Sequence, residues 1–285
     1  MLAIARLVPP SVGHLLADKL GRRISRDRKS PIVNAVRANQ WVVSGCSANA
    51  EMLDQLTEAV FINHGHALFD YYHYFQNRVG LNKLVTLDDS FLRVIEHSQT
   101  RDQAQLLLMP HYANYDLAAM AATHKGLSMQ VLSYPNPGRG YRWQNKFRNA
   151  KGVEVTPITV SSLRTAMRNL ETNGTVFTGV DRPYGESSLH PHFFGRPSAL
   201  PTGYIRLAIK TDVPIKVILC STTPDGKTIL SASDPIPVIH HADPDREQLL
   251  NVSRVLSVIE TQIRSNPTHW SMFYPVWPDV IHNIP

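Results

Sequence analysis

A histidine and a carboxylate stand five residues apart, at His111 and Asp116, directly after a short apolar run over residues 106–109. The run predicts a buried strand that ends at Pro110, and the Ala/Leu-rich stretch after the pair predicts a helix. If residues 111–116 turn into that helix, Asp116 can fold back toward the His111 ring. A carboxylate bonded to one ring nitrogen fixes the tautomer, and the other nitrogen can then take a proton from an alcohol. The pair therefore predicts a general-base dyad at the end of a strand.

The spacing of this pair is weak evidence by itself. The chain has 13 histidines, so chance pairs are expected, and an isolated pair is more often a helix cap or a core histidine. Asp181 follows another predicted strand, and it either caps a loop or belongs to the site. The case for chemistry at His111 therefore depends on the elements around it.

Apolar runs that predict strands alternate with stretches that predict helices from residue 105 onward. The strand-like runs cover residues 106–109, 129–133, 153–158, 175–180 and 213–220. This alternation predicts an α/β fold with a mostly parallel central sheet flanked by helices. In such sheets the reactive groups gather beyond the carboxyl ends of the strands, and His111 lies at such an end.

Helix signals lie around and between these runs. Ser161-Ser162 precede one predicted helix, Gly152 ends another, and Asp243-Pro244 open a long final helix. Apolar residues recur at helical spacing over residues 51–75. We therefore expect a helical N-terminal portion over residues 1–100 and an α/β domain over residues 101–285, joined in one compact unit.

Five stretches occur in the order and spacing of one family's motifs. They are 111-HYANYD-116, Arg148 with Gly152, Asp181-Arg182, 193-FFGR-196 and 266-NPTHWSMFYPVWP-278. Together they resemble the bacterial lipid A biosynthesis acyltransferases (lauroyl/myristoyl transferases), with phosphatidylinositol mannoside acyltransferases as close relatives. The chain departs from the family pattern at Ala113 for Gly, Tyr115 for Trp and Arg182 for Gln. The likeness covers roughly residues 30–280, and it implies a glycerolipid acyltransferase-like fold.

The resemblance implies transfer of a fatty acyl group from a thioester, carried on acyl carrier protein or coenzyme A, to a hydroxyl of a membrane glycolipid. His111 would be the general base, because an alcohol is too weak a nucleophile without one. Asp116 would orient His111 and stabilise its imidazolium form, while Arg148 or backbone N–H groups would stabilise the oxyanion. The residues predicted to bind substrate are Asn114, Arg148, Asp181, Arg182, Phe194, Gly195 and Arg196.

No metal or other cofactor is expected. A thiolate leaves readily, and the H-x-H pairs at His64/His66 and His190/His192 lack further ligands at metal spacing. The chain also lacks a G-x-S-x-G motif that would supply an enzyme nucleophile.

The net charge of +6 and the pI of about 9.4 favour an anionic partner, such as lipid headgroups or a phosphorylated carrier. We expect no nucleic acid, because no recognised binding motif accompanies the basic residues. Apolar residues within 1–20 and a basic run over 21–30 predict an ordinary surface helix or an amphipathic helix on an anionic membrane surface. No stretch reaches the roughly 20 apolar residues that span a bilayer.

Two cysteines, Cys46 and Cys220, stand in apolar surroundings far apart in the chain, which indicates buried thiols in a reducing compartment. We therefore expect a peripheral monomer at the cytoplasmic face of the cell membrane. Two other kinds of function stay open. One is acyl transfer or thioester hydrolysis with a soluble or non-glycolipid alcohol, and the other is non-catalytic lipid binding.

Overall fold

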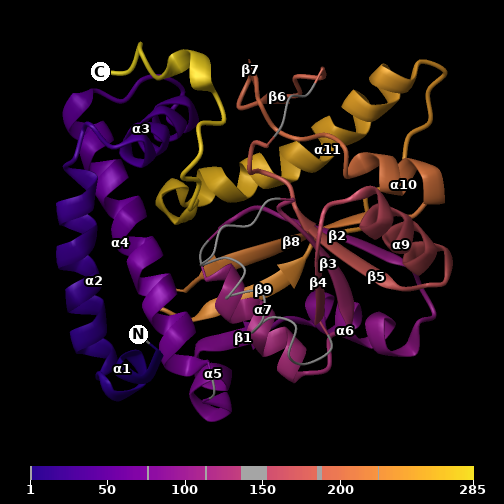
Figure 1. The fold of residues 1–285 in the computed structure, drawn as a ribbon, viewed down its shortest axis with the longest axis horizontal. Helices are drawn as coiled ribbons and strands as arrows, with labels where there is room; N and C mark the ends of the chain where they lie inside the picture. The colour runs from indigo at the N-terminus through magenta and orange to yellow at the C-terminus, as the bar shows by residue number, and fades with distance from the viewer. Residues whose placement is uncertain (1, 76, 113, 136–152, 185–187, 224) are drawn as a thin grey trace.

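A seven-stranded sheet forms the centre of the computed structural model, which describes residues 2–75, 77–112, 114–135, 153–184, 188–223 and 225–285 (Figure 1). The strand order is β1-β9-β8-β2-β5-β3-β4. All neighbours pair in parallel except β8 and β9. The strands are β1 Val85–Leu87, β2 Gln105–Met109, β3 Met129–Ser133, β4 Val153–Pro157, β5 Thr175–Gly179, β8 Ile215–Thr222 and β9 Thr228–Ala232. The predicted α/β class with a mostly parallel sheet is confirmed.

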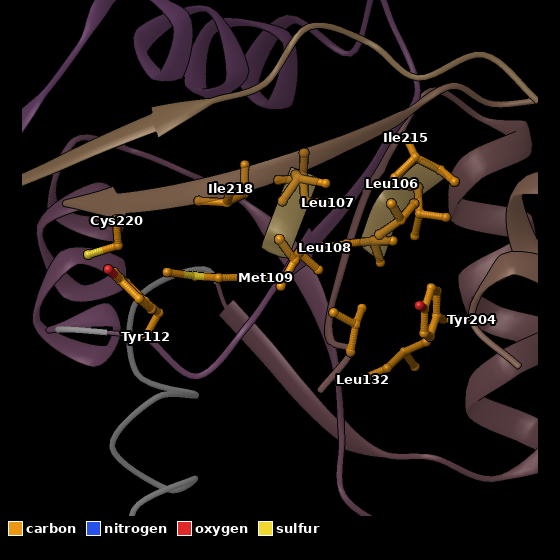
Figure 2. Close-up of a cluster of buried hydrophobic side chains, with 14 of the residues drawn as sticks. Leu106, Leu107, Leu108, Met109, Tyr112, Leu132, Tyr204, Ile215, Ile218 and Cys220 are labelled. Atoms are coloured by element: carbon orange, nitrogen blue, oxygen red, sulfur yellow. The ribbon is translucent and has the colours of Figure 1, made fainter. Parts of the chain in front are cut away.

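The central strands form because their apolar residues are buried on both faces. Every residue of β2 is buried, and Leu106, Leu107 and Leu108 pack in the cluster that Figure 2 shows. The five strand predictions are confirmed to within two residues at their ends. The sequence analysis missed β1, β9 and a two-stranded hairpin of β6 His192–Phe193 and β7 Arg196–Pro197. The short β1 lies inside the predicted helical portion and pairs with β9, so that portion contributes to the sheet.

Helices cover both faces of the sheet (Figure 1). One face carries α6 Asp89–Thr100 and α7 Tyr115–His124, with α5 Arg78–Leu84 against α7. The other carries α9 Val160–Glu171, α10 Ile205–Thr211 and α11 Pro244–Ser265. Asp243 caps α11 as predicted, whereas the cap of α9 is Thr159, which forms a capping box with Ser162. The predicted helix before Gly152 lies outside the described residues.

The first four helices, α1 Leu2–Leu7, α2 Pro10–Ser25, α3 Pro31–Val43 and α4 Ala50–Tyr74, stand beside the sheet (Figure 1). Helices α2 and α4 pack antiparallel through small residues of α2. A Cβ added to Gly13 would lie 2.1 Å from the Phe69 ring, and one added to Gly21 would lie 2.9 Å from Ile62. Because small residues face α4, the large apolar side chains of α2 point outward.

The segment that follows α11 returns to α3, beside which the C-terminus lies (Figure 1). It contains two short 3-10 helices, Pro267–His269 and Pro278–Val280. The buried Asn39 side chain donates to the carbonyls of Met272 and Tyr274 and accepts from the N–H of Val276. This segment is thereby held against the helical portion.

Candidate active site

His111 and Asp181 meet at the carboxyl edge of the sheet. Each lies two residues beyond the end of its strand, and the strands β2 and β5 are parallel neighbours with Met109 opposite Gly179. His111 Nδ1 lies 2.6 Å from Asp181 Oδ1, and the His111 backbone N–H donates to Asp181 Oδ2 at 2.8 Å. Two neighbouring strands therefore place a carboxylate on one ring nitrogen of the histidine.

The Asp181 carboxylate is fully buried, with no exposed surface. Trp270 donates its indole N–H to Asp181 Oδ2 at 2.7 Å. Together with the two bonds from His111, this satisfies a charge that would otherwise be costly to bury. A carboxylate only accepts hydrogen bonds, so in the neutral ring Nδ1 carries the proton and Nε2 keeps its lone pair.

Trp270 also belongs to a backbone contact that holds His111. The Ser271 N–H donates to the His111 carbonyl at 2.8 Å, and Tyr112 forms an isolated β-bridge with Trp270. The motif 266-NPTHWSMFYPVWP-278 carried part of the resemblance, but spacing did not connect its tryptophan with Asp181.

Gly179 leaves room for the histidine ring. A Cβ at this position would lie 3.2 Å from His111 Cε1, which is closer than ordinary van der Waals contact. The last residue of β5 therefore allows the ring to lie close to the strand end.

Asp116, in the first turn of α7, lines the same cavity as His111. The sequence analysis assigned it to orient His111, but the carboxylate on Nδ1 is that of Asp181. His97 and Asp102 have the same spacing, and here the two side chains do contact each other: His97 Nδ1 lies 2.8 Å from Asp102 Oδ1 on the protein surface. Identical spacing thus gives different pairings, and a catalytic role of Asp116 stays a prediction.

A mainly apolar cavity of about 370 Å³ opens beside the dyad. It lies between the sheet and helices α4, α6 and α7, with Tyr71, Phe91 and Met120 among its helical lining. On β3, Met129 lies near the amino end and Ser133 at the carboxyl end, so the lining extends about 13 Å along the strand. Its lining includes the polar residues His111, Asp116 and Arg182, and most of the other lining residues are apolar.

His64, on α4, is a further titratable group close to the dyad. Burial lowers the pKa of His64 to about 4, while the charge of Asp116 raises it and that of His111 lowers it. His64 is therefore neutral near pH 7 and adds no positive charge against a protonated His111. The H-x-H spacing raised His64 only as a metal ligand; among the described residues, no group of three or more His, Cys, Asp or Glu side chains could hold a metal ion.

Arg182 lies at the cavity between two tyrosines. Its guanidinium carbon is 4.0 Å from the centre of the Tyr134 ring and 4.1 Å from that of the Tyr274 ring. Arg182 Nη2 donates to the Tyr274 hydroxyl at 2.5 Å. The sequence analysis identified Arg182 but neither tyrosine, because each comes from a distant segment.

The other predicted substrate-binding residues lie elsewhere. Asn114 donates to the Thr228 hydroxyl at 3.3 Å, and Arg148 lies outside the described residues. Phe194 and Gly195 form the turn of the β6–β7 hairpin, and Arg196 begins β7. The Phe194 N–H donates to Glu260, and Arg196 lies 3.5 Å from Asp279. None of these three lines the cavity in the described part of the chain. Their neighbour Phe193 packs on Trp277 and Trp270, so the hairpin supports the tryptophan that binds Asp181.

Comparison with known proteins agrees with the motif pattern. A family model described as bacterial lipid A biosynthesis acyltransferase matches residues 1–278. The chain belongs to this family. The resemblance inferred from the motifs is thereby confirmed.

Two curated proteins that are similar to this chain are phosphatidylinositol mannoside acyltransferases. That of Mycolicibacterium smegmatis is 24% identical over 182 residues, which are 60% of this chain and 56% of the relative. That of Mycobacterium tuberculosis H37Rv is 23% identical over 182 residues, 60% of this chain and 54% of the relative. The aligned part of the chain thus spans a little over half the length of these curated relatives. A solved structure, the 1-acyl-sn-glycerophosphate acyltransferase PlsC from Thermotoga maritima, matches with a TM-score of 0.40 and 15% identity over 89% of this chain and 97% of that one.

Proposed function

We propose that this chain transfers a fatty acyl group from a thioester of acyl carrier protein or coenzyme A to a hydroxyl of a membrane glycolipid. The observation that carries the proposal is the His111–Asp181 pair beside an apolar cavity. A base with one protonated and one free ring nitrogen suits an alcohol, and an apolar cavity suits an acyl chain. The relatives' names, which include a phosphatidylinositol mannoside, support a glycolipid acceptor.

In the proposed reaction, His111 Nε2 takes the proton of the acceptor hydroxyl while the hydroxyl oxygen attacks the thioester carbonyl carbon. A tetrahedral intermediate forms, with the former carbonyl oxygen as an oxyanion. The oxyanion then collapses, the carbon–sulfur bond breaks, and the departing thiolate takes the proton from Nε2. An ester and a free thiol result, and His111 returns to its starting tautomer.

Charges around the histidine favour its protonated intermediate. Asp181 faces Nδ1, Asp116 adds a second carboxylate to the cavity lining, and His64 stays neutral. Stabilisation of the imidazolium lowers the barrier, because that charge develops as the alcohol loses its proton. Asp116 could therefore stabilise the imidazolium through its charge, without a hydrogen bond to Nδ1.

The test of the proposal is thiol release from long-chain acyl thioesters of coenzyme A and acyl carrier protein, with and without a membrane lipid extract. Release that requires lipid, with appearance of an acylated glycolipid, is the expected result. Release that is independent of lipid would replace the proposal with a thioesterase or an enzyme that uses a soluble alcohol. Absence of release from every donor, together with retained acyl-chain binding, would replace it with lipid binding.

Val131, the central residue of β3, lines the cavity. Val131→Phe should lower kcat/KM for long acyl chains by roughly tenfold and leave short chains near the wild-type value, because the larger ring blocks the far part of the cavity. A series of acyl-coenzyme A donors of increasing length measures this. The matched control is Val258→Phe on α11, whose residue does not line the cavity. A uniform loss across all lengths would contradict this placement of the chain.

We also propose that α2 lies on an anionic membrane surface at the cytoplasmic face, as part of a peripheral monomer. Leu15, Leu16 and Leu20 are 53%, 50% and 59% exposed. Exposed basic residues, including Lys19 and Arg23, share this outward side of the helix. A basic, apolar outer face is typical of helices that bind lipid headgroups. In the described part of the chain, no helix is long and apolar enough to cross a bilayer.

Replacing Leu15, Leu16 and Leu20 with serine should reduce flotation with anionic liposomes by at least about tenfold, since each loses buried apolar area at the membrane. The control variant has serine in place of Leu92, Val160 and Leu250, which are exposed on other helices. Its flotation should be unchanged. Equal flotation of both variants would exclude α2 as the contact.

A further inference from the structure

Arg182 is the feature of the site that the acyl-transfer mechanism does not use. Its side chain lines the cavity directly beyond the end of β5, next in sequence to Asp181. Tyr134 lies beyond the end of β3, so the stack of Arg182 between Tyr134 and Tyr274 stands at the same sheet edge as the dyad. The guanidinium is therefore held in a fixed plane beside the reacting groups.

The charge of Arg182 has no carboxylate at ion-pair distance among the described residues. The adjacent Asp181 carboxylate is occupied by His111 and Trp270. Arg182 Nε is buried and, within the described part of the chain, has no hydrogen-bond partner. A planar cation with an unpaired donor, in a mainly apolar cavity, is suited to an oxyanion of a ligand.

A second stacked arginine shows that stacking alone does not explain this arrangement. The guanidinium of Arg264 lies 4.7 Å from the centre of the Phe194 ring, and it pairs with Glu260 at 3.0 Å. The charge of Arg264 is thus neutralised by Glu260, one turn away on α11. Arg182 is stacked in the same way and faces the cavity instead.

We propose that Arg182 binds a phosphate group of a substrate at the cavity, with Tyr134 and Tyr274 holding the guanidinium flat. This inference rests on the proposed acyl transfer and adds the substrate chemistry of the same site. Two substrates can bring the phosphate: the phosphopantetheine arm of the acyl donor, or the phosphodiester of a lipid acceptor.

Calorimetric binding of two matched pairs of compounds tests the proposal without any turnover. The first pair is the S-dodecyl thioethers of phosphopantetheine and pantetheine, which mimic the donor and cannot transfer an acyl group. The second pair is dihexanoyl phosphatidylglycerol and dihexanoylglycerol, each below its micelle concentration. The compounds of the first pair differ only in the phosphate. Those of the second pair differ in the phosphate and in the glycerol headgroup attached to it.

We expect the wild-type chain to bind one phosphate compound roughly tenfold more tightly than its phosphate-free partner, which is the usual size of a charged hydrogen bond. Arg182→Gln should remove that ratio, whereas the control Arg264→Gln should keep it. Loss of the ratio in the first pair assigns the phosphate to the donor, and loss in the second assigns it to the acceptor. Because the ratio is taken within one variant, a general loss of folded protein cancels from it.

The proposal is overturned if neither pair shows a phosphate preference in the wild type, or if the preference survives in Arg182→Gln. Failure of the acyl-transfer proposal gives a different result. In that case thiol release is absent, while the phosphate preference and its dependence on Arg182 are still measured by binding.

Discussion

Replacing His111 with alanine is expected to lower the rate of acyl transfer by roughly 10³-fold, within the range that a positioned general base contributes. The substitution removes the ring that joins the buried Asp181 carboxylate to the cavity. The acceptor hydroxyl would then have to attack the thioester without transferring its proton. Single-turnover thiol release in the presence of lipid acceptor measures the loss.

The chain provides a matched control for this variant. His97→Ala removes a histidine with the same spacing to an aspartate and the same Nδ1-to-carboxylate contact, but on the protein surface. It should leave the rate unchanged. A comparable loss in both variants would mean that the effect comes from folding, and a His111→Ala enzyme with near-normal turnover would exclude His111 as the base.

Asp181→Asn is expected to reduce turnover by a similar factor, on the order of 10³-fold, through the tautomer of His111. Asp181 Oδ2 accepts from both the His111 backbone N–H and the Trp270 indole, so the asparagine carbonyl will occupy that position. Its amide NH2 then faces Nδ1 and donates to it. This moves the ring proton to Nε2, where the lone pair is needed.

The asparagine variant separates the two candidate carboxylates. If Asp181 orients the base, Asp116→Asn retains more activity than Asp181→Asn, and the surface control Asp102→Asn retains all of it. The double variant with His111→Ala should be little slower than His111→Ala alone, because the two residues act as a unit. A larger loss in Asp116→Asn than in Asp181→Asn would assign the orienting role to Asp116.

The parts of the fold that could be predicted from the sequence are those with dense local signals. Strand β2 is a run of leucines that ends before Pro110, and it was predicted to within one residue. The start of α11 was predicted from Asp243-Pro244. Strand β1 has only three residues and is stabilised by pairing with β9, where Val85 lies opposite Thr228, 143 residues later in the sequence. No local pattern carries that information, so β1 was missed.

The same limit applies to the site. The position of His111 at a strand end followed from its local sequence, but its partner depends on which strands are neighbours. Strands β2 and β5 lie side by side although β3 and β4 come between them in sequence. Spacing therefore favoured the nearby Asp116, and the pairs of Asp181 with His111 and Trp270, 70 and 89 residues apart, could not be predicted.

The late position of Trp270 has a consequence for the order of synthesis. His111 leaves the ribosome long before Trp270, on the order of ten seconds earlier at typical elongation rates. Until residues 270–276 emerge, Asp181 lacks its indole donor and the His111 carbonyl lacks the Ser271 N–H. A nascent chain that already contains both members of the dyad is thus still without the contacts that hold them. We therefore expect the proposed acyl transfer to require translation beyond residue 276.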